Sequence, residues 1–303
     1  MEPQAYINRE VAAGKDIVFG EHHDSFESTM GMLEETVRQN PGRIQAVSVE
    51  FSPRLQPYID QVASGTLSVE DFTRLCRISN EQEYMEIGGA LHAQGRLSDD
   101  QYDRLVRFSE NTIQAVLGGT NNADYPPQRQ AIDVSTYGAL YSLVRTAAEK
   151  GVPVIASDLG REALPLNVLD TMTVADLIDR MDDTSDGNLL AGRVDLNSPQ
   201  SILVHRGAFH LWDLTSERDP SVSNAGKGMD DYLEAHGRHV VVIGNYESTD
   251  VLSGEVDSLR KDHVSVRDPS DVTIINGQLV EQPDQDIAER GIAPVSPGGL
   301  APK

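Results

Sequence analysis

Short runs rich in β-branched residues recur along this chain, and amphipathic segments with helical spacing lie between most of them. The runs occupy residues 16–20, 44–51, 152–158, 201–205 and 238–244. A short apolar run closed by a turn residue is typical of a buried strand, and the longer segments are typical of helices. Strands that alternate with helices form a mainly parallel sheet covered on both faces, so the sequence predicts an α/β fold.

One long segment interrupts this alternation. Between residues 55 and 117, apolar residues recur every three or four positions with no strand pattern among them. The segment exceeds one crossover helix, so we expect several helices that form a cap beside a ligand crevice. We predict an α/β core over residues 1–54 and 128–282, with a helical insertion over residues 55–127. Residues 283–303, rich in proline and glycine, are predicted to be a flexible tail.

The remaining elements are predicted from caps, breakers and periodicity. We expect a helical or coiled lead-in over residues 1–15 and helices over 25–39, 128–150 and 226–236, with Thr173 capping a helix over 174–181. Residues 184–199 are predicted to be mostly loop. Order is expected to weaken after Glu255, except for a final hairpin over 272–280 that turns at Asn276-Gly277.

Charge and composition narrow the function classes. The formal net charge of -23 would repel a phosphate backbone, so we expect no nucleic-acid partner. A single cysteine, Cys76, cannot form an internal disulfide, and a buried structural thiol is the expected state. Residues 1–14 lack a signal-peptide pattern, and no run reaches the roughly 18 apolar residues of a membrane helix. We therefore expect a cytoplasmic protein, or one secreted without a recognisable signal peptide.

Ionisable residues gather where the predicted strands end. The first strand runs into Gly20-Glu21-His22-His23-Asp24, and the second closes on Glu50. The third closes on Asp158, and the fourth carries His205 and is followed by His210. The carboxyl ends of parallel strands line the crevice of an open α/β sheet, so these side chains should converge at one edge. This convergence predicts a functional site.

Two imidazoles and one carboxylate form a common ligand set for a divalent transition metal such as Mn, Co, Zn or Fe. In this interpretation His23, Glu50 and His210 bind the metal, and Glu21 is the general base that moves a proton from water. A metal-free alternative uses the same residues, with a carboxylate-oriented histidine taking the proton directly. Spacing in the sequence does not separate the two.

His22, Asp158 and His205 are predicted to contact substrate. Each also has a structural interpretation: His22 as a packing or capping residue, Asp158 as the N-cap of a segment beginning at Leu159, and His205 as a residue packed within its strand. A standard serine hydrolase is disfavoured because the sequence has no Gly-x-Ser-x-Gly motif. A dinucleotide-binding site is disfavoured because no Gly-x-Gly-x-x-Gly follows the first strand. Cys76 lies far from the strand ends and is a poor candidate nucleophile.

The motif from Gly20 to Asp24, the strand ending in Glu50, and Gly207-Ala208-Phe209-His210-Leu211 resemble one superfamily. It comprises erythromycin esterases, ChaN-like haem-binding lipoproteins and Tiki/TraB proteases, and related domains occur in bacterial toxins. Its hallmark is two Gly-x-x-His motifs and one glutamate on an α/β core. The resemblance implies that His23, Glu50 and His210 match the metal-binding set of Tiki-like members, and that Glu21 with His23 matches the acid–base pair of the esterases.

The esterases usually place one more residue between Gly-Glu and the histidine, so this chain is closer to the ChaN and Tiki pattern. A shared fold and site do not imply a shared substrate. We expect a hydrolase that cleaves an ester or amide bond in a small molecule or peptide, with assistance from a divalent metal. The alternatives are a non-catalytic module that binds haem or another ligand, and a toxin or effector domain that acts through contact with a partner.

Overall fold

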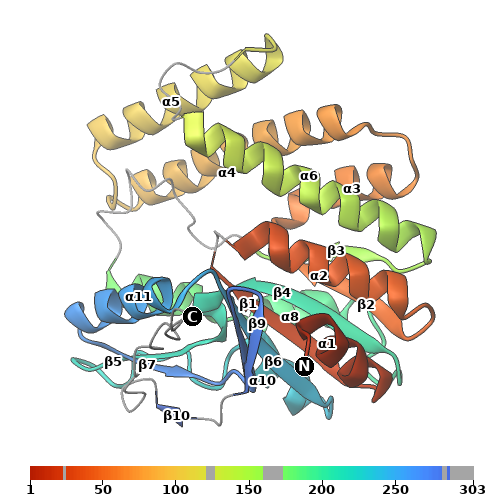
Figure 1. Cartoon of the computed structure of the whole chain (residues 1–303). Coiled ribbons are helices and arrows are strands. Elements are labelled where there is room, and N and C mark those ends of the chain that lie inside the picture. The colour runs from red at the N-terminus through yellow and green to blue at the C-terminus, as the bar shows by residue number, and fades with distance from the viewer. Residues whose placement is uncertain (23–24, 121–126, 160–172, 282–284, 287–303) are drawn as a thin grey trace, which may run out of the picture.

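The computed structural model describes residues 1–22, 25–120, 127–159, 173–281 and 285–286 (Figure 1). The main strands are β1 (Asp16–Glu21), β2 (Ile44–Val49), β3 (Val154–Ala156), β4 (Ser201–Gly207), β6 (Val240–Tyr246), β8 (Val272–Ile275) and β9 (Gln278–Glu281). In the described residues they form a seven-stranded sheet in the order β3-β2-β4-β1-β6-β8-β9. Only the β8–β9 pair within it is antiparallel. The predicted α/β fold with a mainly parallel sheet is confirmed.

Helices pack on both faces of this sheet. One face is covered by α1 (Pro3–Ala12), α2 (Phe26–Gln39), α3 (Gln56–Ala63) and α6 (Pro127–Glu149). The other face carries α7 (Val174–Arg180), α8 (Thr184–Ala191), α9 (Ala208–Leu211), α10 (Met229–Ala235) and α11 (Thr249–Lys261). Strand β1 shows the alternation that this requires, since Ile17 and Phe19 join the first core and Val18 joins the second.

The predicted insertion is helical where the structure describes it. After a short 3-10 helix (Pro53–Leu55) come α3, α4 (Val69–Ala93) and α5 (Asp99–Leu117). Ser68 and Ser98 accept hydrogen bonds from backbone N–H groups in the first turns of α4 and α5, so each helix begins at a side-chain cap. Figure 1 shows α5 at the top of the view, farthest from the sheet, with α4 and α6 between α5 and the sheet. The first part of α4 belongs to the main core, because Phe72 and Cys76 are fully buried there.

Two predictions for the second half of the chain are wrong. Residues 184–191, expected to be loop, form α8. The periodicity of this segment is weak, and tertiary packing supports the helix: Leu190 is fully buried, and a Cβ at Gly187 would overlap the Tyr232 ring of α10. The order expected to weaken after Glu255 instead continues through α11 and β7 (Val264–Asp268).

A second, small sheet went unpredicted. Strand β7 pairs antiparallel with β5 (Asp213–Ser216) and with β10 (Gln285–Asp286). These strands are far apart in the sequence, so local patterns carry little information about their pairing. The final hairpin is confirmed, because Asn276 and Gly277 take the positive φ values of 51° and 69° that a tight turn requires. No described helix is long and apolar enough to cross a membrane.

Candidate functional site

The carboxyl ends of β1, β2 and β4 meet at one edge of the sheet. The Cα of Glu21 at the end of β1 is in register with Gly207 at the end of β4 and with Asn245 on β6. Glu50 directly follows β2. The sheet therefore brings Glu21, Glu50, His205 and the segment leading to His210 together, as the sequence predicted. His23 lies outside the described residues.

The two glycines that open the Gly-x-x-His motifs allow this close approach. Helix α9 lies over the end of β1, and a Cβ at Gly20 would overlap Leu211. A Cβ at Gly207 would lie 3.2 Å from Glu50 Oε2, whose carboxylate accepts a hydrogen bond from the Gly207 N–H. Each glycine thus occupies a position where a second group needs the space of a side chain.

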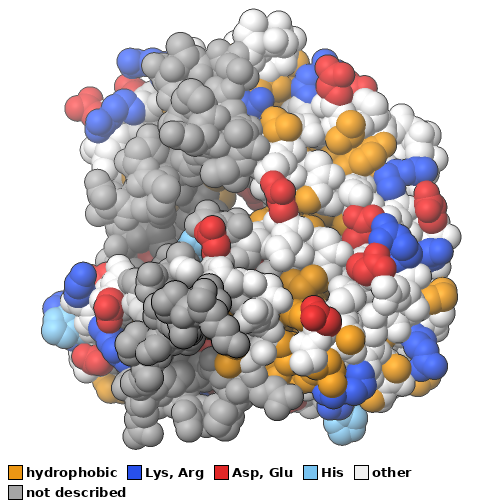
Figure 2. Space-filling view, in the orientation of Figure 1, with side chains coloured by type: hydrophobic (Ala, Val, Ile, Leu, Met, Phe, Trp, Pro, Cys, Tyr) orange, Lys and Arg blue, Asp and Glu red, His pale blue; other side chains and the backbone are white. Residues whose placement is uncertain are grey.

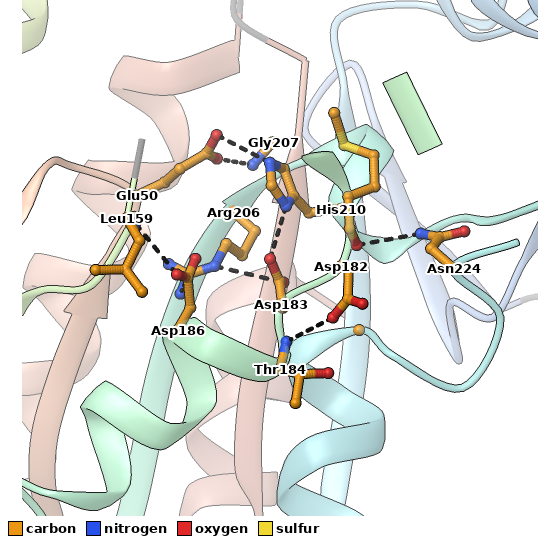
Figure 3. Close-up of polar contacts among 12 residues, drawn as sticks. Glu50, Leu159, Asp182, Asp183, Thr184, Asp186, Arg206, Gly207, His210 and Asn224 are labelled. Carbon is orange, nitrogen blue, oxygen red and sulfur yellow. Dashed lines mark hydrogen bonds and ion pairs between the residues drawn. The ribbon is translucent and has the colours of Figure 1, made fainter. Parts of the chain in front are cut away.

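His210 is held between two carboxylates (Figure 3). Its Nδ1–H donates to Asp183 Oδ1 at 2.8 Å, and its Nε2 lies 3.5 Å from Glu50 Oε1. The side chain is 4% exposed. Burial alone would lower the pKa of His210, but the charges of Asp183 and Glu50 outweigh it and raise the pKa from 6.5 to about 9. Without a bound metal, His210 is therefore mostly protonated at neutral pH.

A buried arginine, Arg206, forms an ion pair with Asp183. Arg206 on β4 is 0% exposed, and its Nε lies 3.6 Å from Asp183 Oδ2. Its Nη2 donates to Ser157 Oγ at 2.9 Å and lies 3.7 Å from Asp186 Oδ2. Burial would lower the pKa of Arg206, but the surrounding carboxylates raise it above its ordinary value, so the guanidinium stays charged. It neutralises part of the negative charge that α8 brings to this edge.

Asp186 is the other carboxylate of this network. Its Oδ1 accepts a hydrogen bond from the Leu159 N–H at 3.1 Å, and it faces Arg206 in Figure 3. Burial raises the pKa of Asp186 to about 7, and the negative charges of Asp183 and Asp158 add to this, while Arg206 opposes it. Asp186 is thus only partly ionised at neutral pH.

Glu21 and His205 form a second imidazole–carboxylate pair. His205 Nε2 lies 3.4 Å from Glu21 Oε1, and the Phe26 ring of α2 contacts the imidazole edge to face at a centroid distance of 5.2 Å. His205 shares the register and face of Phe19, and therefore lies on the α2 side of the sheet. Arg206, the next residue, lies on the α8 side. The two pairs thus flank the end of β4 on opposite faces of the sheet.

The remaining predicted residues lie along the same edge. His22 is half-buried, and its backbone N–H donates to the Asn245 carbonyl at 3.2 Å. Asp158 is also half-buried, two residues beyond β3, and its charge contributes to the raised pKa of His210. The Leu159 N–H bonds to Asp186 Oδ1, and the rest of the segment that Asp158 was predicted to cap lies outside the described residues. No described contact assigns a substrate role to His22 or Asp158.

The helical insertion reaches this edge through α4. Glu83 Oε1 accepts a hydrogen bond from Ser52 Oγ at 2.9 Å, just beyond Glu50 in the sequence. Burial raises the pKa of Glu83, and the nearby charge of Asp158 contributes, although Ser52 and Arg54 act in the opposite direction. The insertion therefore places a carboxylate within electrostatic range of the strand ends, and its role as a cap stays a prediction.

The described residues around His210 have donor types and spacing that suit a bound metal ion. Asp183 bonds to Nδ1 and the Gly207 N–H bonds to Glu50 Oε2, while His210 Nε2 faces Glu50 Oε1 (Figure 3). Two donors at about 2.1 Å from a tetrahedral metal lie about 3.4 Å apart, close to the observed 3.5 Å. A carboxylate on the second imidazole nitrogen is also the usual support of a metal-ligating histidine. Within the described residues, however, no cluster of three or more His, Cys, Asp or Glu side chains is arranged to bind a metal.

Sequence reasoning missed Asp183, Asp186 and Arg206. The two aspartates lie in segments that were expected to be loop or the end of a helix. Arg206 directly follows His205, the last residue of the predicted fourth strand. A buried-strand pattern interrupted by arginine was the available signal, because a buried guanidinium requires carboxylate partners. In comparisons with known proteins, no family model, no curated protein and no solved structure matched this chain.

Proposed function

We propose that this chain is a hydrolase that activates water between His210 and Glu50 and cleaves an ester or amide bond. The observation that carries the proposal is the arrangement of His210: it is buried, its Nδ1 is held by Asp183, and its Nε2 faces Glu50 at 3.5 Å. An imidazole oriented by a carboxylate and aimed at a second carboxylate is a common arrangement for moving protons to and from water.

The raised pKa of His210 favours the metal-assisted version of this proposal. An imidazole with a pKa of about 9 holds its proton at neutral pH and is a poor general base for water. A histidine that binds a metal must be neutral, so metal binding at Nε2 would displace that proton. Glu50 Oε1 and His210 Nε2 would hold the metal, with His23 as the third ligand that the sequence predicts. A bound divalent ion would lower the pKa of water to about 7.

The protein residues have separate tasks in this proposal. Asp183 fixes the ring orientation and tautomer of His210, and the Arg206 guanidinium, with Nε 3.6 Å from Asp183 Oδ2, stabilises the charge of Asp183. The Gly207 N–H orients the Glu50 carboxylate, so that Oε1 faces the reacting water. The role of Glu21 as the general base stays a prediction, since its carboxylate lies against His205 on the α2 side.

The haem-binding and toxin or effector alternatives also stay predictions. Neither is favoured by a described contact. A haem ligand needs an apolar slot beside its free imidazole nitrogen, whereas His210 Nε2 faces the Glu50 carboxylate.

Hydrolysis can be tested with His210→Ala and Glu50→Gln on a panel of p-nitrophenyl esters and peptide p-nitroanilides. The protein is first treated with chelator and then supplied with Mn²⁺ or Zn²⁺. We expect each variant to lose roughly 100-fold or more in kcat, because each removes a side chain that would hold the metal beside the reacting water. Exposed His236→Ala serves as the matched control and should retain wild-type turnover.

Wild-type turnover in His210→Ala would contradict the proposal, provided the metal content of each sample is measured. Absence of turnover across the panel, together with a Soret shift on titration with haemin, would instead support the haem-binding alternative.

A further inference from the structure

The second imidazole–carboxylate pair, Glu21 and His205, is buried without the contacts that such groups normally need. Each residue is 2% exposed. Among the described residues, neither ring nitrogen of His205 has a hydrogen-bond partner, and Glu21 Oε2 also has none. A buried polar group that is left unpaired is unfavourable, so several such atoms side by side point to a ligand that binds them.

The spacing of the pair indicates what kind of ligand this is. His205 Nε2 and Glu21 Oε1 are 3.4 Å apart, whereas a charge-assisted N–H···O bond is about 2.7–2.9 Å long. The observed distance is close to the separation of about 3.4 Å expected for two donors bound to one tetrahedral metal ion. The pair at His210 and Glu50 has nearly the same spacing, 3.5 Å.

The donor types and the charge also fit a cation. An imidazole nitrogen with a carboxylate oxygen suits Zn, Mn, Fe or Co better than Mg or Ca, which prefer oxygen donors alone. The nearest ring beyond the pair, Phe26, contacts His205 edge to face and offers no competing acceptor. The edge already carries Glu50, Asp158 and Asp183, so a cation there would also relieve repulsion among carboxylates.

We propose that Glu21 and His205 bind a second divalent transition metal ion, separate from the one proposed at Glu50 and His210. The register places the two pairs around one residue: the Glu21 Cα is paired with Gly207, and the Gly207 N–H bonds to Glu50. With two protein donors, water would have to supply the remaining ligands of this ion. This inference rests on the Glu21 and His205 contacts and does not require that the protein be a hydrolase.

The test counts bound ions. Chelator-treated full-length protein is titrated with Mn²⁺ or Zn²⁺ alone, by calorimetry and by elemental analysis after gel filtration. We expect two ions per chain in the wild type and one in Glu21→Gln or His205→Gln, because each variant keeps the side-chain size and removes a metal-binding donor. His210→Ala should also bind one ion, and the His205→Gln/His210→Ala double variant should bind none.

Phe26→Leu is the matched control, since it changes the contact to His205 without removing a donor, and it should still bind two ions. Thermal unfolding followed by circular dichroism confirms that each variant is folded, and Glu21→Gln answers the question if His205→Gln does not fold. A wild type that binds no ion, or an ion count that is unchanged in both Glu21→Gln and His205→Gln, would overturn the inference in favour of a plain ion pair. A single ion that is lost in Glu21→Gln but kept in His210→Ala would support the inference and count against the metal at His210. The hydrolase proposal would still stand if turnover is lost in His210→Ala but kept in Glu21→Gln and His205→Gln.

Discussion

Asp186 should make the protein less stable as the pH rises through neutrality, and Asp186→Asn should remove this effect. Burial raises the pKa of Asp186 from 3.8 to about 7. A raised pKa means that the folded state binds the proton more tightly than the unfolded state does. Its stabilising contribution is therefore complete below pH 3.8 and is lost as the pH rises through about 7. The whole effect is worth about 4 kcal/mol, at about 1.4 kcal/mol for each pH unit between the two values.

The assay is urea unfolding of chelator-treated protein, followed by circular dichroism at several pH values. Titration arithmetic places about 3 kcal/mol of the effect between pH 5 and pH 8. Asp230, whose pKa burial also raises to about 7, titrates in this range in both proteins, so its effect cancels in the difference between variant and wild type. Asparagine resembles the protonated form and does not titrate, so the unfolding free energy of Asp186→Asn relative to wild type should rise by that amount across this range. Exposed Asp179→Asn on α7 is the control and should show no such trend.

A stability difference between Asp186→Asn and wild type that stays constant from pH 5 to pH 8 would refute this reasoning. It would mean that the ion pair with Arg206, at 3.7 Å, compensates for the burial of the charge.

Three further outcomes follow from the same edge of the sheet. Gly20→Ala should lower the unfolding free energy by about 1–3 kcal/mol, because its Cβ would overlap Leu211. Gly31→Ala, where a Cβ would meet open space, is the control and should show no such loss in thermal unfolding. Gly207→Ala should weaken Mn²⁺ binding, measured by calorimetry, because its Cβ would lie 3.2 Å from Glu50 Oε2. Its effect on the unfolding free energy should be smaller than that of Gly20→Ala. An unchanged Mn²⁺ affinity would count against the site. Each bound Mn²⁺ at a hundred times its Kd should add about 2.7 kcal/mol to the unfolding free energy, measured with and without chelator.

The prediction of the sheet succeeded because buried parallel strands have a strong local signature. The run Ile17-Val18-Phe19 is buried on both faces, and a strand of this kind reads as continuous apolar sequence. Elements stabilised mainly by distant partners carried no such signature. Helix α8 depends on packing against α10, and strands β5 and β7 pair across about 50 residues of chain.

The candidate site divides in the same way. Glu21, Glu50 and His205 could be placed together from the sequence because each lies at or near the end of a strand, and parallel strands end at one edge. The partners of His210 could not, because Asp183 comes from the start of a helix that the sequence pattern did not reveal. The Arg206 network was missed for the same reason: its carboxylates come from α8.

The sequence by itself determined which polar groups arrive at the end of each strand, because strand length and alternation are local properties. Only the tertiary structure decided which imidazole faces which carboxylate. Side chains on β4 alternate between faces, so His205 meets Glu21 beneath α2 while Arg206 meets Asp183 beside α8. These pairings, and the shifted pKa values of His210 and Asp186, arise from burial between layers that no single segment encodes.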